Sequence, residues 1–312
     1  MRRRPLLTLA AAAPFVAAAP ALAACESGGE EATATLRIAT GSPGAVYYRY
    51  GSAIAELAKK YLPNVHASVL STAASQINVD YLLNDTADVA FTQADIAADN
   101  EKAHPRQLAA LARLYDDHIH VVVSANGPIS GLKQLQNHRV SVGAQGSGTA
   151  VTADRVLTLS EVTVERVQLG LDDSVKALRT GAIDGFFFSG GLPVSAIAEL
   201  ARQFPIRLLN LADPVPKLRA RYGDYYAERV VPASTYTGIQ PTVAIGIANY
   251  LVVRATMSDP LAYGVTRLLF EGRDDLAKAH QAAARLNIRS AISTPPLPLH
   301  SGAIRYYRAQ KA

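Results

Sequence analysis

Two glycine loops, each set between a short apolar run and a helical pattern, constrain the fold of this chain most. The first, residues 41–47, follows the apolar run at 36–39, and the second, residues 143–149, follows the run at 139–142. A strand that turns through glycines directly into a helix is typical of α/β folds. We therefore expect parallel strands covered by helices in both halves of the chain.

The helix expected after the first loop has the clearest periodicity in the sequence. Tyr47, Tyr50, Ile54, Leu57 and Tyr61 recur at steps of three and four residues. This spacing lays one apolar stripe along one helix face, so it predicts a helix that packs on a sheet.

The order of elements recurs along the chain. Asp88 lies at the start of the strand expected at 87–91, and Asp184 lies at the start of the strand expected at 182–188. Each strand follows a helical pattern. This weak internal similarity predicts two α/β lobes of similar build.

Two long β-branched runs, 118–123 and 242–254, are expected to cross between the lobes as a two-strand hinge. The helical patterns near the C-terminus would then return to the first lobe. The expected boundaries are 35–121 with 250–312 for lobe 1, and 122–249 for lobe 2.

The N-terminus has the pattern of an export signal. Three arginines precede an alanine-rich apolar stretch, and Leu22-Ala23-Ala24-Cys25 resembles a bacterial lipobox. We expect a lipoprotein signal peptide over 1–24, lipidation of Cys25 and a flexible tether over 25–34. The expected location is extracytoplasmic, lipid-anchored to the outer face of the cell membrane.

Composition excludes some classes of function. The formal net charge is +5, and the expected signal peptide carries three arginines of that excess. There is no basic run interleaved with aromatic residues, so we expect no nucleic acid as a partner. The single cysteine excludes an intramolecular disulfide and a CxxC metal site. We expect a monomer without a cofactor.

Both glycine loops favour an anionic ligand such as a carboxylate. Glycines let backbone N–H groups approach the ligand, and the helix that follows adds its partial positive end. The hydroxyls of Ser147 and Thr149 would assist. An ordinary tight turn is the alternative for each loop. Neither loop matches GxxxxGK[ST] or GxGxxG, so nucleotide binding is not expected.

Strand ends supply further candidates, because ligands of α/β proteins lie where the carboxyl ends of strands face a crevice. Gln93 follows the strand at 87–91, and Phe188 with Ser189 has the same place in the second lobe. Tyr47 would close over the ligand or pack in the core. One of Ser71 and Ser75 would cap a helix. The expected ligand-binding residues are Gly41, Ser42, Ala45, Val46, Tyr47, Ser71, Gln93, Gln145, Gly146, Ser147, Gly148, Thr149, Phe188 and Ser189.

Two other chemistries, metal binding and catalysis, have candidate residues in the sequence. His118 and His120 beside two aspartates invite a metal site, but they also fit a loop leading into the hinge strand, with both histidines on its exposed face. No GxSxG motif is present. An enzyme would need an acid or base in the cleft, and Asp95 is the candidate, although it also fits a helix N-cap.

Five segments in this order resemble the TAXI family, the solute receptors of tripartite ATP-independent periplasmic (TRAP) transporters. They are TGSPGAVYY, TQADIA, SVGAQGSGT, IDGFFFSGG and PLPLHSGAIRYYR, and together they span nearly the whole chain after the signal. The first loop with its tyrosines and the tail with His300, Tyr306 and Tyr307 are the most specific parts.

The resemblance implies an α/β, two-lobed type II periplasmic-binding-protein fold. It also implies capture of a small organic solute, glutamate, glutamine or a related dicarboxylate, for a TRAP-type membrane permease. Tyr47, Gln93, Ser147 and Thr149 would be the main contacts. Ser42, Pro43 and Arg49 depart from the family's loop, so the resemblance does not carry the solute's identity. A sensor feeding a membrane kinase and an enzyme on the same scaffold remain alternatives.

Overall fold

The computed structural model describes residues 34–311, and Thr33–Ala312 form one compact unit. The expected signal peptide, Cys25 and all of the expected tether except Ala34 lie outside the described residues. Within 34–311, no helix is both long and apolar enough to cross a bilayer.

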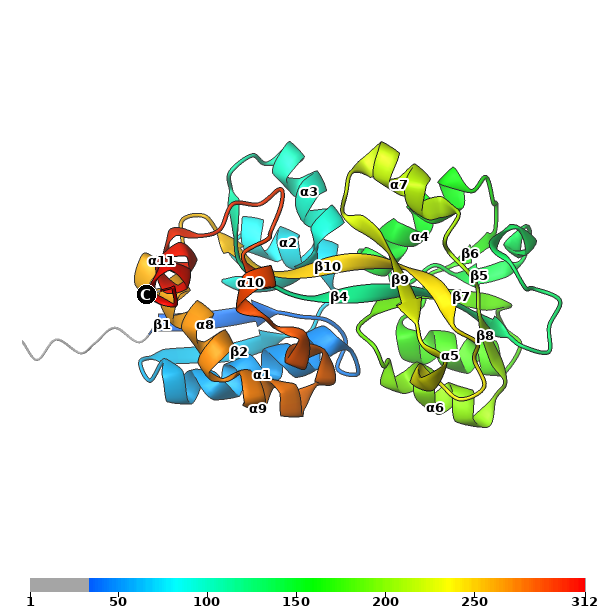
Figure 1. Cartoon of the computed structure of the whole chain (residues 1–312), viewed down its shortest axis with the longest axis horizontal. Coiled ribbons are helices and arrows are strands. Elements are labelled where there is room, and N and C mark those ends of the chain that lie inside the picture. Colours follow the sequence, from blue (N-terminus) through cyan, green and yellow to red (C-terminus); the bar gives the residue numbers. More distant parts are fainter. Residues whose placement is uncertain (1–33, 312) are drawn as a thin grey trace, which may run out of the picture. The chain divides into compact units, whose positions relative to one another are not determined.

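The first half contains three parallel strands covered by helices (Figure 1). Strand β1 pairs with β2 and with β3, with Leu36 opposite Ala67 and Ile38 opposite Val89. All five residues of β3 are buried, as expected for a strand covered on both faces. The elements are β1 (Ala34–Ala39), α1 (Val46–Tyr61), β2 (Val65–Leu70), α2 (Ser75–Leu83), β3 (Val89–Gln93) and α3 (Ala94–Ala103).

The second half repeats this plan with shorter strands. Strand β5 pairs in parallel with β6 and with β7, with Val140 opposite Arg166 and Gly185. The elements are η1 (Leu132–Leu135), β5 (Arg139–Ser141), α4 (Gly148–Leu159), β6 (Glu165–Val167), α5 (Leu171–Arg179), β7 (Gly185–Gly190), α6 (Ser195–Gln203), β8 (Ile206–Leu208), α7 (Pro214–Tyr222), β9 (Tyr226–Val231) and η2 (Ala233–Thr235).

Two long antiparallel strands, β4 (Leu108–Ser124) and β10 (Thr242–Arg254), run through both halves (Figure 1). β10 pairs with β3 of the first half, and β4 pairs with β7 of the second. The strand order β2-β1-β3-β10-β4-β7-β5-β6 therefore joins two α/β lobes through two crossing strands. This confirms the predicted fold class. The predicted lobe boundaries fall inside these strands and stay predictions.

One part of the sequence interpretation was wrong. Residues 116–120 do not form a loop before the hinge strand, because β4 begins at Leu108 and passes through them without a break. His120 is buried with 1% of its surface exposed, and His118 is partly buried, so the two histidines do not share an exposed face. The prediction failed because the charged residues Asp116 and Asp117 interrupt the apolar pattern of β4, although neighbouring strands bury this part of it.

The C-terminal elements pack against the first lobe. One core cluster combines Ile38 and Tyr50 with Leu268, Leu276 and Tyr306. The predicted stripe of α1 faces this cluster. The elements are α8 (Asp259–Glu271), α9 (Arg273–Ala279), η3 (Gln281–Arg285), α10 (Ile288–Ala291) and α11 (Ser301–Ala309).

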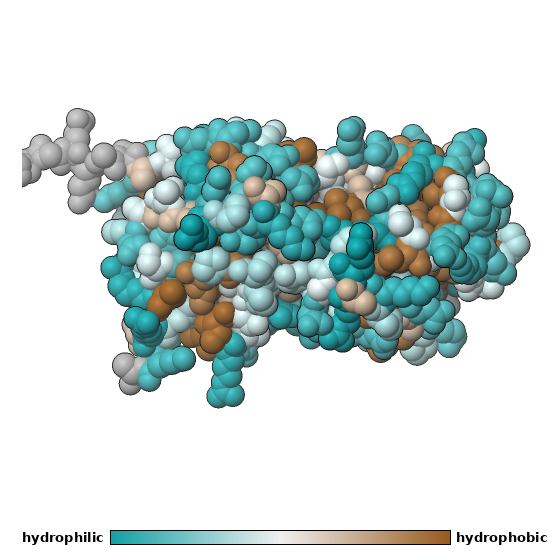
Figure 2. Space-filling model, turned by 90° about the horizontal axis from the view of Figure 1, so that it is seen from above, coloured by the Kyte–Doolittle hydropathy of each residue, from teal (hydrophilic) through white to brown (hydrophobic). Residues whose placement is uncertain are grey.

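The visible surface is mostly hydrophilic, with smaller apolar areas in both lobes (Figure 2). Val230 and Ile292 are the large apolar side chains left exposed among the described residues. Scattered apolar groups of this kind are normal on a soluble fold.

Candidate functional site

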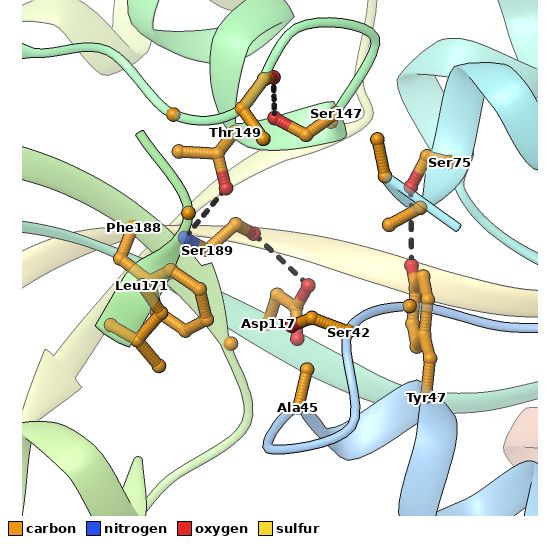
Figure 3. Close-up of a pocket in the computed structure, with 18 of the residues that line it drawn as sticks. Ser42, Ala45, Tyr47, Ser75, Asp117, Ser147, Thr149, Leu171, Phe188 and Ser189 are labelled. Carbon is orange, nitrogen blue, oxygen red and sulfur yellow. Dashed lines mark hydrogen bonds between the residues drawn. The ribbon is translucent and has the colours of Figure 1, made fainter. Parts of the chain in front are cut away.

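A cavity of about 160 Å³ lies where the two lobes meet, beside the crossing strands (Figure 3). Its walls come from the loops and strand ends of both lobes. Its volume is small compared with the roughly 300–1,000 Å³ of pockets for drug-sized ligands. The site therefore has room for a small solute.

Four helices begin at this cavity. The N-cap and the first residue of α1, α2, α4 and α5 all line it, two helices from each lobe. The pairs are Ala45 with Val46, Ala74 with Ser75, Ser147 with Gly148, and Gly170 with Leu171. Each helix start leaves backbone N–H groups without intrahelical partners and carries a partial positive charge. Four such ends around one small cavity make a site suited to an anion.

Most of the predicted site residues lie together in the cavity wall. They are Gly41, Ser42, Ala45, Val46, Tyr47, Gln93, Ser147, Gly148, Thr149, Phe188 and Ser189. Three predicted residues do not line it. The Ser71 hydroxyl donates to the Gly41 carbonyl, 3.1 Å away, and so stabilises the first loop without lining the cavity. Gln145 and Gly146 lie further along the second loop.

Gly146 has a different task at the junction of the lobes. Its φ is +76°, a left-handed conformation that favours glycine. A Cβ at this position would lie 2.8 Å from Ile77 of α2, so the loop of the second lobe packs directly against a helix of the first. A side chain here would hold the lobes apart.

The two hydroxyls predicted to bind the ligand already have protein partners. Ser147 caps α4, because its Oγ accepts from the Ala150 N–H at 3.1 Å and donates to the Ala144 carbonyl at 2.7 Å. Thr149 Oγ1 accepts from the Ser189 N–H at 3.1 Å and keeps its own proton for another acceptor (Figure 3). Thr149 is therefore the better donor to a ligand.

Asp117 is the carboxylate that the sequence interpretation missed at this site. It lies on β4, lines the cavity and is 4% exposed. Its Oδ2 accepts from Ser189 Oγ at 3.0 Å (Figure 3) and from Gln93 Nε2 at 3.1 Å. Its Oδ1 and the Gln93 Oε1 have no hydrogen-bond partner in the structure. Both oxygens are buried, and the Gln93 oxygen lies against Gly148, so neither is open to the cavity in this structure.

Burial raises the pKa of Asp117 to about 6, from an ordinary value of 3.8. Desolvation is the main cause, and the hydrogen bonds from Ser189, Gln93 and Asn249 oppose it. The neighbouring Asp116 raises the pKa slightly further. A carboxylate that stays ionised at neutral pH under these conditions is held at a cost to stability.

Tyr47 joins the core to the site. Its ring stacks on Phe91 with centroids 5.0 Å apart, and its hydroxyl donates to Asn249 Oδ1 and lies 3.3 Å from Ser75 Oγ. Tyr47 therefore packs in the core and also lines the cavity, and its contact with a ligand stays a prediction. The expected helix cap was wrong: Ala74 is the N-cap of α2 without a side-chain bond, and Ser75 Oγ instead accepts from the Gln93 N–H. Phe186, by contrast, is fully buried core.

Asp95 does not line the cavity, which removes the candidate acid or base of the enzyme alternative from the site. It is buried on α3 and forms an ion pair with Arg155 of α4 at 3.2 Å. Tyr226 donates to the same carboxylate oxygen at 2.8 Å. Asp99 binds the other end of the guanidinium, which also lies over the Tyr222 ring.

The histidines of β4 are not arranged as metal ligands. His120 Nε2 lies 3.0 Å from the Tyr236 hydroxyl, and its Nδ1 lies 2.8 Å from the His118 carbonyl. Across residues 34–311, no group of three or more His, Cys, Asp or Glu side chains is placed to hold a metal ion.

The other missed residues come from parts of the chain with weak sequence signals. Thr72 and Ala73 lie in the loop before α2, and Leu169 lies before α5. Tyr115 precedes Asp117 by two residues on β4, so both side chains lie on the same face of that strand. Extending the predicted strand back to Leu108 would have put both residues on one strand face, but not in the cavity.

Solved structures of two-lobed binding proteins share this fold. The periplasmic aliphatic sulphonate binding protein SsuA from Escherichia coli is 17% identical, with a TM-score of 0.50, over 88% of this chain and 83% of that chain. A putative L-cystine ABC transporter protein from Listeria monocytogenes is 15% identical, with a TM-score of 0.55, over 79% and 94%. XAC2383 from Xanthomonas citri, solved bound to ATP, is 12% identical, with a TM-score of 0.54, over 88% and 95%.

A family model covers almost all of the described residues. The model of the NMT1-like family matches residues 38–310, from β1 to the end of α11. The match includes both glycine loops, both crossing strands and every residue that lines the cavity. The chain belongs to the NMT1-like family.

Proposed function

We propose that this protein is a solute receptor that closes its two lobes around a small carboxylate. The observation that carries the proposal is the meeting of four helix N-termini, two from each lobe, at one cavity. Each lobe supplies half of the contacts, so the solute favours the closed state. The shared fold of the sulphonate- and cystine-related proteins is consistent with this role.

The composition of the cavity wall supports binding without chemistry. Its ionisable side chains are Asp117 and the phenols of Tyr47 and Tyr115, with no lysine, histidine or cysteine among the lining residues. A hydrolase or transferase would need a nucleophile activated by a base; Ser189 donates to Asp117 at 3.0 Å, but Gln93 occupies the same carboxylate oxygen and no histidine lines the wall. The proposed receptor therefore releases its solute unchanged.

The proposed destination of the solute is a TRAP-type permease. The segments that resemble the TAXI family support this finer assignment. The glutamate, glutamine or dicarboxylate expected from that resemblance fits a cavity of about 160 Å³. Lipid on Cys25 and a tether over 25–34 would hold the receptor close to the permease at the outer face of the membrane, where tethering raises its effective concentration.

A thermal-shift screen of amino acids and carboxylates tests the binding function. A ligand that binds only the folded protein at a hundred times its dissociation constant adds about 2.7 kcal/mol of stability, so the melting temperature rises. Thr149→Val should lose most of the shift, because it removes the hydroxyl proton that remains free. Thr149→Ser should keep the shift.

Thr152→Val is the matched control on the same helix. The Thr152 hydroxyl bonds the Gly148 carbonyl at 3.0 Å and does not line the cavity, so its loss should leave the shift intact. The proposal fails if no carboxylate stabilises the protein, or if Thr149→Val responds as the wild type does.

A further inference from the structure

Two cavity-lining residues, Asp117 and Gln93, each have one buried oxygen without a hydrogen-bond donor. Asp117 Oδ1 and Gln93 Oε1 can only accept, and the Gln93 amide nitrogen links the two side chains through Asp117 Oδ2. Buried acceptors without partners are costly, and native proteins seldom leave them so. A ligand group with several donors that reached these oxygens through a small side-chain movement would remove this cost.

The charge of the wall points to the same group. No lysine, arginine or histidine occurs among the lining residues, so no side chain there balances the charge of Asp117. A protonated primary amine offers three N–H donors, no acceptor and one positive charge. It satisfies both the charge and the hydrogen-bonding demand of the Asp117–Gln93 pair.

We propose that the cavity binds a small zwitterion, an α-amino acid with an uncharged side chain, whose ammonium group bonds Asp117 and Gln93. Its carboxylate faces the N-termini of the four helices. This inference rests on the proposed receptor function and narrows its solute class. A dicarboxylate without an amine would bring two negative charges to a wall that already carries one.

The charges of the cavity-lining side chains also limit which side chain the solute can carry. A second carboxylate, as in glutamate, would find no cationic side chain in the wall, and a second ammonium would find no second carboxylate. The volume of about 160 Å³ also favours a compact solute. Uncharged amino acids therefore fit better than acidic or basic ones.

Paired ligands test the ammonium site by isothermal titration calorimetry at pH 7.5. Each uncharged L-amino acid is titrated beside the same acid without its amine, for example alanine with propionate and glutamine with glutaramate. In the pair that binds best, the amino acid should bind at least about 30-fold more tightly, since one partner of a buried charge pair is lost in the other ligand.

Asp117→Asn should remove this preference, because the near-isosteric amide carries no negative charge. Asp116→Asn is the control. Asp116 neighbours Asp117 on β4, bonds Arg113 at 2.6 Å and Arg229 at 2.9 Å, and does not line the cavity. This variant should keep the ratio between the paired ligands even if absolute affinity changes.

The outcomes separate the two proposals. Tight binding of acids without an amine, or a ratio that persists in Asp117→Asn, overturns the ammonium site and leaves the carboxylate receptor standing. Binding of neither member of any pair, with glutarate and succinate also inactive, overturns both. A 30-fold ratio in the wild type that is lost in Asp117→Asn and kept in Asp116→Asn supports the inference.

Discussion

At the scale of single residues, the buried carboxylate of Asp117 lowers the stability of the ligand-free protein, and we infer that it is kept for binding. The charged carboxylate is buried with one unsatisfied oxygen, and its raised pKa measures that cost. Core aspartates with a purely structural role are usually paired or replaced by apolar groups. The cost is explained if a ligand supplies the missing partner.

We predict that Asp117→Asn stabilises the ligand-free protein at pH 7.5 by about 1–3 kcal/mol. The folded-state pKa of about 6 lies above the ordinary 3.8, so the charged form is penalised above pH 6 and the penalty fades as pH falls toward 4. Urea denaturation at pH 7.5 and 4.5 measures both values. A variant less stable than the wild type at pH 7.5 would refute the argument.

The sequence predicted the cavity-lining residues unevenly, for physical reasons. Gly41, Ser147 and Gln93 were found because loops and strand ends have strong local signals. Asp117 was missed because its place in the cavity depends on two neighbouring strands, β10 and β7, that bury the middle of β4. No local pattern at 116–118 carries that information.

At the scale of elements, the internal similarity between the lobes has a matching geometry. The Arg37 N–H donates to Asp88 Oδ2 at 2.7 Å, and the Arg139 N–H donates to Asp184 Oδ2 at 3.0 Å. Each aspartate thus ties the start of its own strand to the first strand of its lobe. The two aspartates noted in the sequence therefore have the same structural role.

Helices α3 and α4 hold the lobes together through Arg155. Its guanidinium bonds Asp95 and Tyr226 in a buried cluster and also binds Asp99. In the wild type, separation of the lobes breaks this buried ion pair, so the pair favours the closed state. Arg155→Met removes that contribution and should weaken solute affinity at least about tenfold. Calorimetry with the best-binding solute measures the change.

Arg166→Met is the control for this prediction. Arg166 pairs with Asp154 of the same helix, but both side chains are about half exposed, and such pairs contribute under about 1 kcal/mol. Affinity should hardly change in this variant. Wild-type affinity in Arg155→Met would show that the ion pair has no part in closure.

At the scale of the whole molecule, the alternation of strands and helices was enough to predict two α/β lobes joined by two strands. The hinge was harder to predict, because β4 begins at Leu108, ten residues before the apolar run at 118–123 that indicated it. Where β4 begins depends on its pairing with strands of both lobes, and no single segment of the sequence encodes that pairing.

A crystal structure of the complex with the tightest-binding solute tests the central claim most directly. The account predicts the solute between the lobes, its carboxylate on the N-termini of α1, α2, α4 and α5 and its amine within hydrogen-bonding distance of Asp117 and Gln93. A solute bound outside this cavity, or one held without contact to any of the four helix starts, would contradict it.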